Sequence, residues 1–184
     1  MAKLRKDFKE NLKWNVQDLY KTEEDYLKDY QFVKEHLKDY SEYQGHLLDN
    51  ENILYEALSF DNHLSKILER IYVYAHINND SDTTEVKYQA MYGKAYKLYE
   101  EYQEACSFLV PEILKGDRAL IEEYIKKNSK LKEYERVLTD IFRLKEYVLS
   151  DKEEKILSSL STTFSIPDQV YSYLTDADMK FGTI

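Results

Sequence analysis

The chain has few of the residues that break helices or form tight turns. Only four glycines and two prolines occur in its 184 residues, which leaves little turn chemistry for a β-sheet. Long stretches instead carry apolar residues at alternating steps of three and four, the spacing that lines one side of an α-helix. The sequence therefore predicts an all-α fold: a bundle of long antiparallel helices, then several shorter helices, ending at the start of a strand. At this length one domain over residues 1–184 is expected.

Cysteine, basic charge and long apolar runs are also scarce. Cys106 is the only cysteine, so no internal disulfide can form and a reducing compartment is favoured. Acidic residues outnumber basic ones by 35 to 26, for a formal charge of −9. Because neutralising phosphates requires a net basic face, neither a nucleic acid nor an anionic membrane is expected as a partner. No apolar run approaches the ~20 residues of a membrane-spanning helix, and the N-terminus lacks the apolar region of a secretion signal.

Three long helices are predicted within residues 22–110. The first follows Thr22, a capping residue, and acidic residues in its first turn suit the helix dipole; it ends near Gly45. The second begins at Asp49 or Asn50, with a local break expected at residues 59–61, where the side chains form helix poorly.

The third helix, residues 83–109, is predicted to be central and to pair antiparallel with the second across a short turn. Capping oxygens lie in residues 80–83, and Pro111 is expected to stop the helix and to push Val110 out of the helical region. Gly93 interrupts its pattern, which is either simple tolerance or the mark of another backbone passing close.

Two apolar stripes run along this third helix. The first comprises Tyr88, Met91, Ala95, Leu98, Tyr102, Ala105 and Leu109, and the second comprises Tyr92, Tyr96, Tyr99 and Cys106. Core packing is the favoured interpretation of both stripes, with a ligand-binding wall as the alternative. Cys106 is interpreted as a small apolar residue rather than a nucleophile.

Residues 111–179 are predicted to form shorter helices. Local signals mark their ends: Gly116 closes one, Asp117 caps another that stops at Asn128, and Ser150 with Glu153 forms a capping box.

Pro167 is expected to open a further helix, which runs to Leu174, and Thr175 with Asp178 to cap a last turn. Residues 1–20 are interpreted as a leader followed by an aromatic anchor from Trp14 to Tyr20, and residues 180–184 as the start of a strand.

No catalytic or metal-binding motif is present. The four histidines, His36, His46, His63 and His76, never occur as a pair one helical turn apart, which the zinc motif H-E-x-x-H requires. No glycine pattern cradles phosphate, and no G-x-S-x-G occurs. The sequence thus predicts no catalytic residue and no metal ligand.

Several segments, in order, resemble the N-terminal region of the oligoendopeptidase F family, a group of thimet oligopeptidase-like zinc metallopeptidases. The segments are Trp14 to Tyr20, Asp80 to Thr83, Ser107 to Glu112, Leu131 to Leu157 with its Arg143-x-Lys145 step, and Leu174 to Ile184. One departure is Tyr147, where relatives often carry histidine.

The resemblance implies that the chain is the N-terminal helical domain of a longer, cytoplasmic zinc enzyme that cuts oligopeptides. Such a domain faces a catalytic domain across a deep channel and limits access to short, unfolded peptides. The zinc motif would lie downstream of residue 184, so this chain alone is expected to bind no zinc and to be inactive. Tyr92, Tyr96 and Tyr99 are the candidate wall of the substrate channel.

The expected partners are therefore the catalytic domain of the same polypeptide and oligopeptide substrates. A free-standing helical interaction module is the alternative, and the apparent strand start at residues 180–184 favours the first interpretation. An unpaired strand and nearby apolar residues also predict self-association through residues 166–184.

Overall fold

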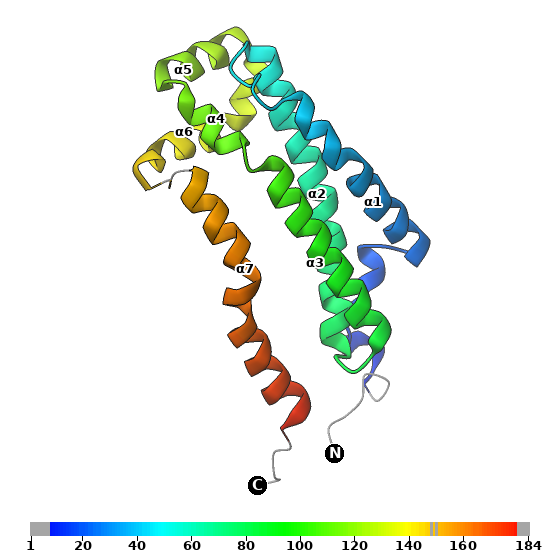
Figure 1. The fold of residues 1–184 in the computed structure, drawn as a ribbon. Helices are drawn as coiled ribbons and strands as arrows, with labels where there is room; N and C mark the ends of the chain where they lie inside the picture. Colours follow the sequence, from blue (N-terminus) through cyan, green and yellow to red (C-terminus); the bar gives the residue numbers. More distant parts are fainter. Residues whose placement is uncertain (1–7, 148, 150, 180–184) are drawn as a thin grey trace. The chain divides into compact units, whose positions relative to one another are not determined.

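The fold is known from a computed structural model that describes residues 8–147, 149 and 151–179 (Figure 1). The described residues form helices and their connections, with no strand among them, so the all-α prediction is confirmed. The chain divides into two compact units, residues 1–145 and 146–184. None of the described helices is long and apolar enough to cross a membrane.

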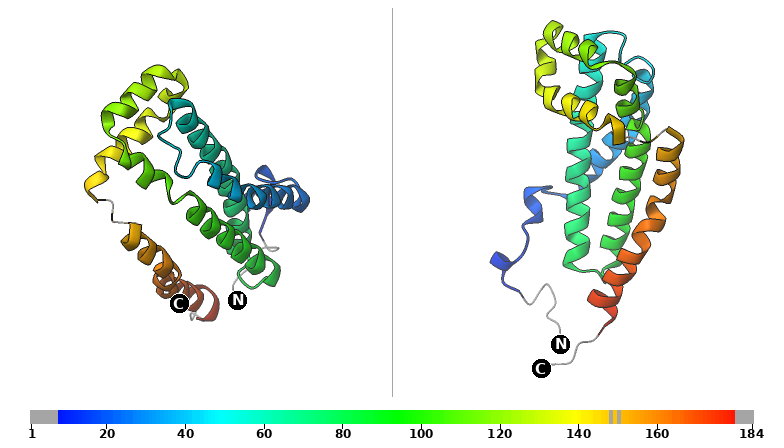
Figure 2. Two further views of the ribbon diagram at one scale, coloured as in Figure 1. Left: turned by 45° about the horizontal axis from the view of Figure 1, so that its top comes forward. Right: turned by 90° about the vertical axis from the view of Figure 1, so that its left-hand side faces the viewer.

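Three long helices make the body of the first unit. They are α1 (Glu23–His36), α2 (Glu51–Ser81) and α3 (Val86–Cys106), and a 3-10 segment, η4 (Leu37–Glu42), continues α1. Helices α2 and α3 run antiparallel, as predicted, and α1 lies against α2 (Figures 1 and 2). The central helix is α2 rather than α3, because α2 packs against α1, α3, α5 (Arg118–Lys127), η3 (Val16–Asp18) and η5 (Ser129–Tyr134).

The helix starts follow local capping chemistry, with one correction. Thr22 accepts a hydrogen bond from the Asp25 amide, and Asn50 caps α2 as predicted. The predicted caps at residues 80–83 are wrong: α2 continues through Ser81, and the side chain of Glu85 caps α3.

The break predicted at residues 59–61 is absent, because tertiary contacts hold this part of α2 in place. Phe60 packs edge-on against the Tyr40 ring, with centroids 5.0 Å apart. The Asp61 carboxylate accepts hydrogen bonds from the hydroxyls of Tyr40, at 2.7 Å, and Tyr102, at 2.8 Å. These contacts outweigh the weak helix propensity of the segment.

The core of the bundle follows the first stripe of α3. Met91, Ala95, Leu98 and Tyr102 are buried as the spacing predicted. They pack in one cluster with buried residues of α2, which include Leu54, Ala57, Leu58, Leu64, Leu68, Ile71 and Ala75. The spacing of apolar residues in the sequence was sufficient to predict this buried face of α3.

Two polar networks join parts of the chain that are distant in sequence. Glu112 is buried, and its carboxylate accepts hydrogen bonds from the amides of Gly45, at 2.8 Å, and Leu47, at 2.9 Å. Gly45 has φ +90°, the left-handed conformation that glycine adopts without strain. The second network links Tyr20, Asp29 and Arg70, and the Arg70 guanidinium also lies over the Tyr20 ring.

Four shorter helical segments complete the first unit: α4 (Leu109–Lys115), α5 (Arg118–Lys127), η5 (Ser129–Tyr134) and α6 (Glu135–Arg143). Gly116 and Asp117 act as predicted, as the end of α4 and the cap of α5. Pro111 does not stop a helix. It lies in the first turn of α4, where a backbone N–H has no partner to lose, and Val110 is helical beside it.

Residues 8–22, the described part of the chain before α1, contain two short 3-10 turns, η2 (Glu10–Leu12) and η3 (Val16–Asp18). Within the segment predicted to be an aromatic anchor, residues 14–20, Trp14 is 72% exposed. Tyr20 holds the segment against the bundle, because its ring is buried against Tyr26 and Tyr74.

After the 3-10 turn η6 (Lys145–Tyr147), the second unit contains α7 (Asp151–Ser172), followed by a π-helical turn, η7 (Tyr173–Asp178). Pro167 lies inside α7, so the prediction of a new helix there is wrong. Thr175 does not cap a last turn either, since its hydroxyl donates back to the Tyr171 carbonyl. The predicted cap at Ser150 and the strand at residues 180–184 lie outside the described residues.

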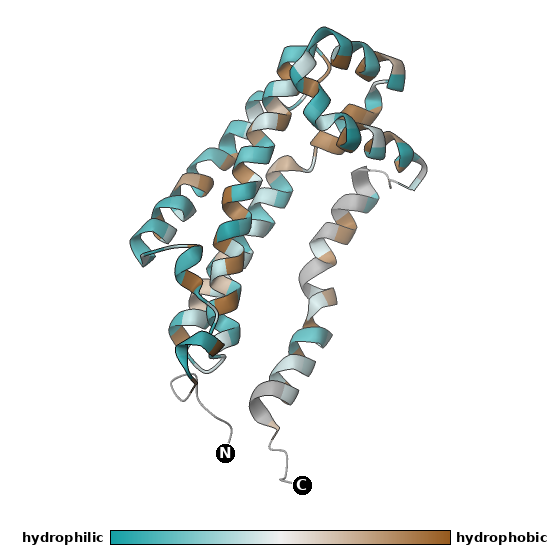
Figure 3. Ribbon diagram, turned by 180° about the vertical axis from the view of Figure 1, so that it is seen from behind, coloured by the Kyte–Doolittle hydropathy of each residue, from teal (hydrophilic) through white to brown (hydrophobic). Residues whose placement is uncertain are grey.

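Apolar residues recur along α7 (Figure 3) and continue into η7. The exposed ones are Ile156, Leu157, Leu160, Phe164, Ile166, Val170, Tyr171, Tyr173 and Leu174.

Candidate functional site

The three tyrosines singled out in the sequence lie together on α3, where they meet two residues of α2. We call the set Tyr72, His76, Tyr92, Tyr96 and Tyr99 the tyrosine face. The Tyr72 ring lies 5.8 Å from the rings of both Tyr92 and Tyr99, and the Tyr92 ring lies 6.3 Å from Tyr96. Tyr92 and Tyr96 are half-buried and Tyr99 is 42% exposed. The face is thus a continuous, partly accessible row of rings.

The α2 members of the tyrosine face were missed in the sequence. Tyr72 and His76 stand four residues apart, one helical turn, so they share a side of α2. His76 packs edge-on to Tyr92, at 5.3 Å, and its Nδ1 pairs with Asp80 at 3.0 Å. The 3, 4 spacing of α2 would have placed this pair on one side, but only the packing of α2 on α3 joins it to the tyrosines.

The chemistry of the tyrosine face suits binding rather than catalysis. The hydroxyls of Tyr72 and Tyr92 are 3.2 Å apart and share a hydrogen bond. Burial, with that hydrogen bond as a second cause, raises the pKa of Tyr92 above its ordinary value, so its hydroxyl stays neutral near pH 7. Neutral phenols offer ring surface together with donors and acceptors, which is the combination that contacts a peptide.

Gly93 lies on another side of α3 and is exposed. A methyl group built there would meet no atom of another described residue within 4 Å. The hypothesis that a second backbone passes close to Gly93 therefore finds no support among the described parts of this chain.

The described residues do not fit a zinc ion. Over residues 8–147, 149 and 151–179, no group of three His, Cys, Asp or Glu side chains gathers in a way that holds a metal. His36 bonds the Phe32 carbonyl, and His46 pairs with Asp49. Cys106 packs against the core, and burial raises the pKa of its thiol to about 11, so it is a poor nucleophile.

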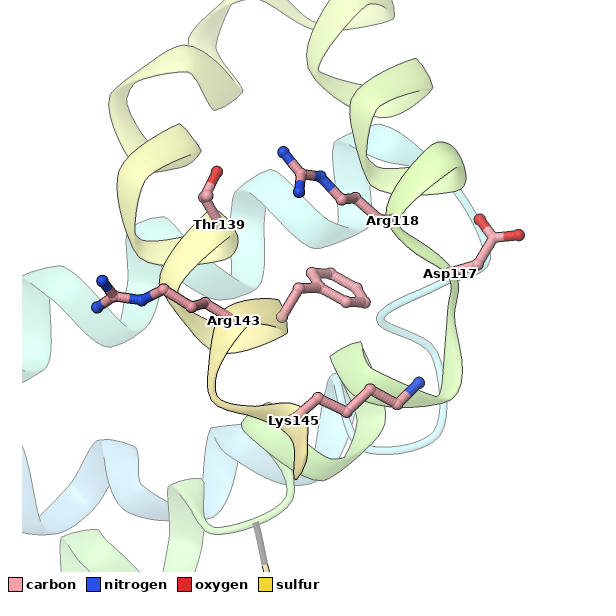
Figure 4. Close-up of a pocket in the computed structure, with 6 residues that line it drawn as sticks. Asp117, Arg118, Thr139, Arg143 and Lys145 are labelled. Atoms are coloured by element: carbon pink, nitrogen blue, oxygen red, sulfur yellow. The ribbon is translucent and has the colours of Figure 1, made fainter. Parts of the chain in front are cut away.

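A second candidate site is an open pocket of about 450 Å³ between the start of α5 and the end of α6 (Figure 4). We call it the cationic pocket; it is lined by Asp117, Arg118, Thr139, Phe142, Arg143 and Lys145. Arg118 and Thr139 stand on one side of it, with Arg143 and Lys145 opposite (Figure 4). The Arg143-x-Lys145 step noted in the sequence thus forms part of its rim.

Comparison with known proteins identifies the kind of protein that carries this fold. A sequence model of the family described as Oligopeptidase F matches residues 112–181. The crystal structure of oligoendopeptidase-F from Enterococcus faecium superimposes with a TM-score of 0.81 at 31% identity, covering 89% of this chain and 32% of that one.

Sequence matches that cover all or nearly all of this chain agree with this assignment. Oligopeptidase PepF of Bacillus subtilis (strain 168) is 34% identical over 98% of this chain and 27% of its own length. The plasmid-encoded Oligoendopeptidase F of Lactococcus lactis subsp. cremoris is 34% identical over all of this chain and 31% of its own length. The chain belongs to the oligoendopeptidase F family and corresponds to its N-terminal region, as the sequence predicted. It spans under a third of the length of these relatives.

Proposed function

We propose that the chain is the substrate-gating helical domain of a cytoplasmic, zinc-dependent oligoendopeptidase that hydrolyses short peptides. The main support is that relatives named as oligopeptidases match it from end to end while being about three times longer. The zinc and the catalytic groups then belong to a catalytic domain of the same polypeptide, since the described residues gather no metal-binding set. The role of this chain is to bind and admit the substrate.

The tyrosine face is the proposed wall of the substrate channel. Tyr92 and Tyr96 are half-buried and Tyr99 is exposed, on the side of α3 next to its buried stripe. Rings of this kind contact peptides of many sequences, because every peptide has amides to bond and many carry side chains to pack. A wall that accepts many sequences suits an enzyme that selects by length.

A graft tests the gating role. This chain replaces the matching N-terminal region of the Bacillus subtilis relative, and cleavage of a quenched fluorescent peptide is compared with cleavage of a long unfolded chain. We expect the graft to retain a preference for the short peptide. A triple variant, Tyr92→Ala, Tyr96→Ala and Tyr99→Ala, should raise KM for the short peptide by roughly 10-fold, since an aromatic contact contributes up to about 1.5 kcal/mol beyond its buried area and such losses add only in part.

The matched control is Tyr134→Ala, which removes a half-buried tyrosine outside the tyrosine face. If both variants change KM equally, or the graft cuts long and short substrates alike, the gating proposal is wrong. The isolated chain should show no chelator-sensitive peptide cleavage and no stoichiometric zinc in a metal assay. Cleavage, or one zinc ion bound per chain, would contradict the proposal that the catalytic groups lie elsewhere in the polypeptide.

A free-standing interaction module is the alternative function, and the exposed apolar residues of α7 and η7 favour a binding partner under either reading. On its own the chain should self-associate through residues 166–184, where Ile166, Val170, Tyr171, Tyr173 and Leu174 are exposed. Light scattering of the chain with and without residues 180–184 tests this. If both versions of the chain are monomers of equal stability at high concentration, the predicted self-association is wrong and the free-standing module is favoured.

A further inference from the structure

We infer that the cationic pocket binds the C-terminal residue of an oligopeptide, with the free carboxylate on the rim formed by Arg118, Arg143 and Lys145. The inference rests on the proposed function for the peptide nature of the ligand. It assigns a role to a site that lies on α5 and α6, apart from the tyrosine face on α2 and α3.

The rim cations have hydrogen-bond donors to spare. Arg118 uses Nε to pair with Glu122 at 3.0 Å, and Arg143 uses Nη2 to pair with Asp140 at 3.1 Å. Lys145 donates to the Leu114 carbonyl at 3.2 Å. Each bond engages one donor of a side chain that has several, so the remaining donors can reach a ligand.

These internal ion pairs are weak enough to yield to a ligand. The side chains of Arg118 and Arg143 are 68% and 71% exposed, and their acidic partners are also open to solvent. Exposed pairs of this kind contribute little free energy. A ligand carboxylate can bind one guanidinium through two parallel bonds, whereas each arginine makes a single bond to its acidic partner.

The acidic residue of the pocket does not cancel the rim charge. The Asp117 carboxylate accepts a hydrogen bond from the Leu120 amide at 2.7 Å, which commits it to capping α5. Three cations and one acid line a cavity in a chain whose formal charge is −9. The lining residues thus carry a net positive charge, although Glu122 and Asp140, which pair with the two arginines, stand beside them.

The inner surface of the pocket indicates an organic ligand rather than a bare anion. Phe142 is half-buried and lines the cavity, and an aromatic ring offers a phosphate or sulfate nothing to bond. The volume of about 450 Å³ lies within the ~300–1,000 Å³ of small-ligand pockets. An apolar side chain next to a carboxylate is what the last residue of a peptide presents, and Thr139 can bond the adjoining amide.

Such a site would also help to select peptides by length. A pocket that holds a free chain end fixes the distance from that end to a cleavage site elsewhere in the polypeptide. Internal segments of a long protein have no free carboxylate to place there, so they lose this contact.

The test is direct binding to the chain of residues 1–184. Two fluorescent pentapeptides ending in leucine are compared by anisotropy, one with a free carboxylate and one with a C-terminal amide. We expect the acid to bind roughly 10-fold more tightly, as a charge-assisted contact predicts. The double variant Arg118→Gln and Arg143→Gln should remove most of this preference.

The matched control is Lys94→Gln with Lys97→Gln, two exposed lysines of α3 that change the net charge by the same amount. It should leave the preference intact. Equal binding of acid and amide, equal loss in the control, or competition by inorganic phosphate as strong as by a peptide acid would each overturn the inference.

The outcome is separable from that of the graft experiment. If the acid and the amide bind equally but the graft still prefers short substrates, only the pocket assignment fails. If the pocket distinguishes the two peptides but the graft cuts long and short substrates alike, the gating proposal fails and the pocket assignment stands.

Discussion

Helices α3 and α7 are nearly equal in length, with 21 and 22 residues, yet they use their apolar side chains differently. In α3 the first stripe is buried against α2, and the tyrosines beside it remain partly open. In α7 large apolar residues such as Leu157, Phe164 and Val170 are exposed. The difference shows that periodicity predicts that a helix face will be covered without indicating which surface covers it.

The largest expected effect is alkaline unfolding of the bundle. Burial, reinforced in part by carboxylates such as Asp29 and Asp61, raises the pKa of Tyr20, Tyr26, Tyr40 and Tyr102 above the ordinary value. A raised pKa in the folded state means that stability is complete below about pH 10, where unfolded tyrosine titrates, and is lost as pH rises further.

Ionisation of these four tyrosines should together unfold the bundle well above pH 10. Burial raises the pKa of the Cys106 thiol to about 11, so its ionisation adds to the effect. Tyrosinate absorbance and far-UV circular dichroism should then change together. If the tyrosines ionise fully while the helical signal is unchanged, the rings are not held as the structure places them.

Core truncation compares the two helical regions directly. Leu64 of α2 is 1% exposed, and Leu64→Ala should cost about 3 kcal/mol of unfolding free energy through lost burial and a residual cavity. Leu157→Ala in α7, where the side chain is 44% exposed, should cost under about 1 kcal/mol. Urea denaturation of both variants measures the difference, and equal losses would mean that α7 is as tightly packed as the bundle.

Glu112 tests the long-range polar link in the first unit. Glu112→Gln keeps the size of the side chain but turns an N–H₂ group toward one of the amides of Gly45 and Leu47, which now both donate to the carboxylate. Leaving one buried donor unpaired should cost roughly 2 kcal/mol. The control is Glu122→Gln, an exposed residue of α5, which should change the denaturation midpoint little.

The smallest expected effect separates two buried tyrosines. The Tyr40 hydroxyl donates to Asp61, whereas the buried Tyr26 hydroxyl has no hydrogen-bond partner among the described residues. Tyr40→Phe should therefore lose about 1 kcal/mol, and Tyr26→Phe should be neutral or slightly stabilising, because it removes an unpaired buried group. Thermal unfolding resolves the two, and the opposite ranking would contradict the hydrogen-bond assignment.

Local capping chemistry was predictable, while the effect of proline depended on position. Asp117 caps α5 through an amide three residues away, so sequence alone contains both partners. The sequence predicts helix boundaries at Pro111 and Pro167, but Pro111 occupies the first turn of α4 and Pro167 lies inside α7. A proline in the first turn loses no hydrogen bond, and the sequence does not reveal which turn it occupies until the neighbouring helix start is known.

The candidate sites required contacts that sequence spacing does not contain. Tyr92, Tyr96 and Tyr99 could be grouped because one helix holds them, but Tyr72 and His76 join them only through the packing of α2 on α3. The cationic pocket likewise needs the start of α5 beside the end of α6. Arg143 and Lys145 were visible as part of a family resemblance, yet nothing in their spacing indicated Arg118 or Phe142 as neighbours.

By itself the sequence determined the helical class, the buried stripe of α3 and the caps of α1, α2 and α5, because these depend on side chains within a few residues of one another. It also determined the family, because an ordered set of motifs extends along the chain. Tertiary structure alone decided that α2 is the central helix and that Asp61 bonds Tyr40 and Tyr102 where a break in α2 was predicted. It also decided that Glu112 reaches back to Gly45 and Leu47, and that cations from two helices share one cavity. These features depend on pairing residues far apart in the chain, where the free energy of burial and hydrogen bonding outweighs local preference.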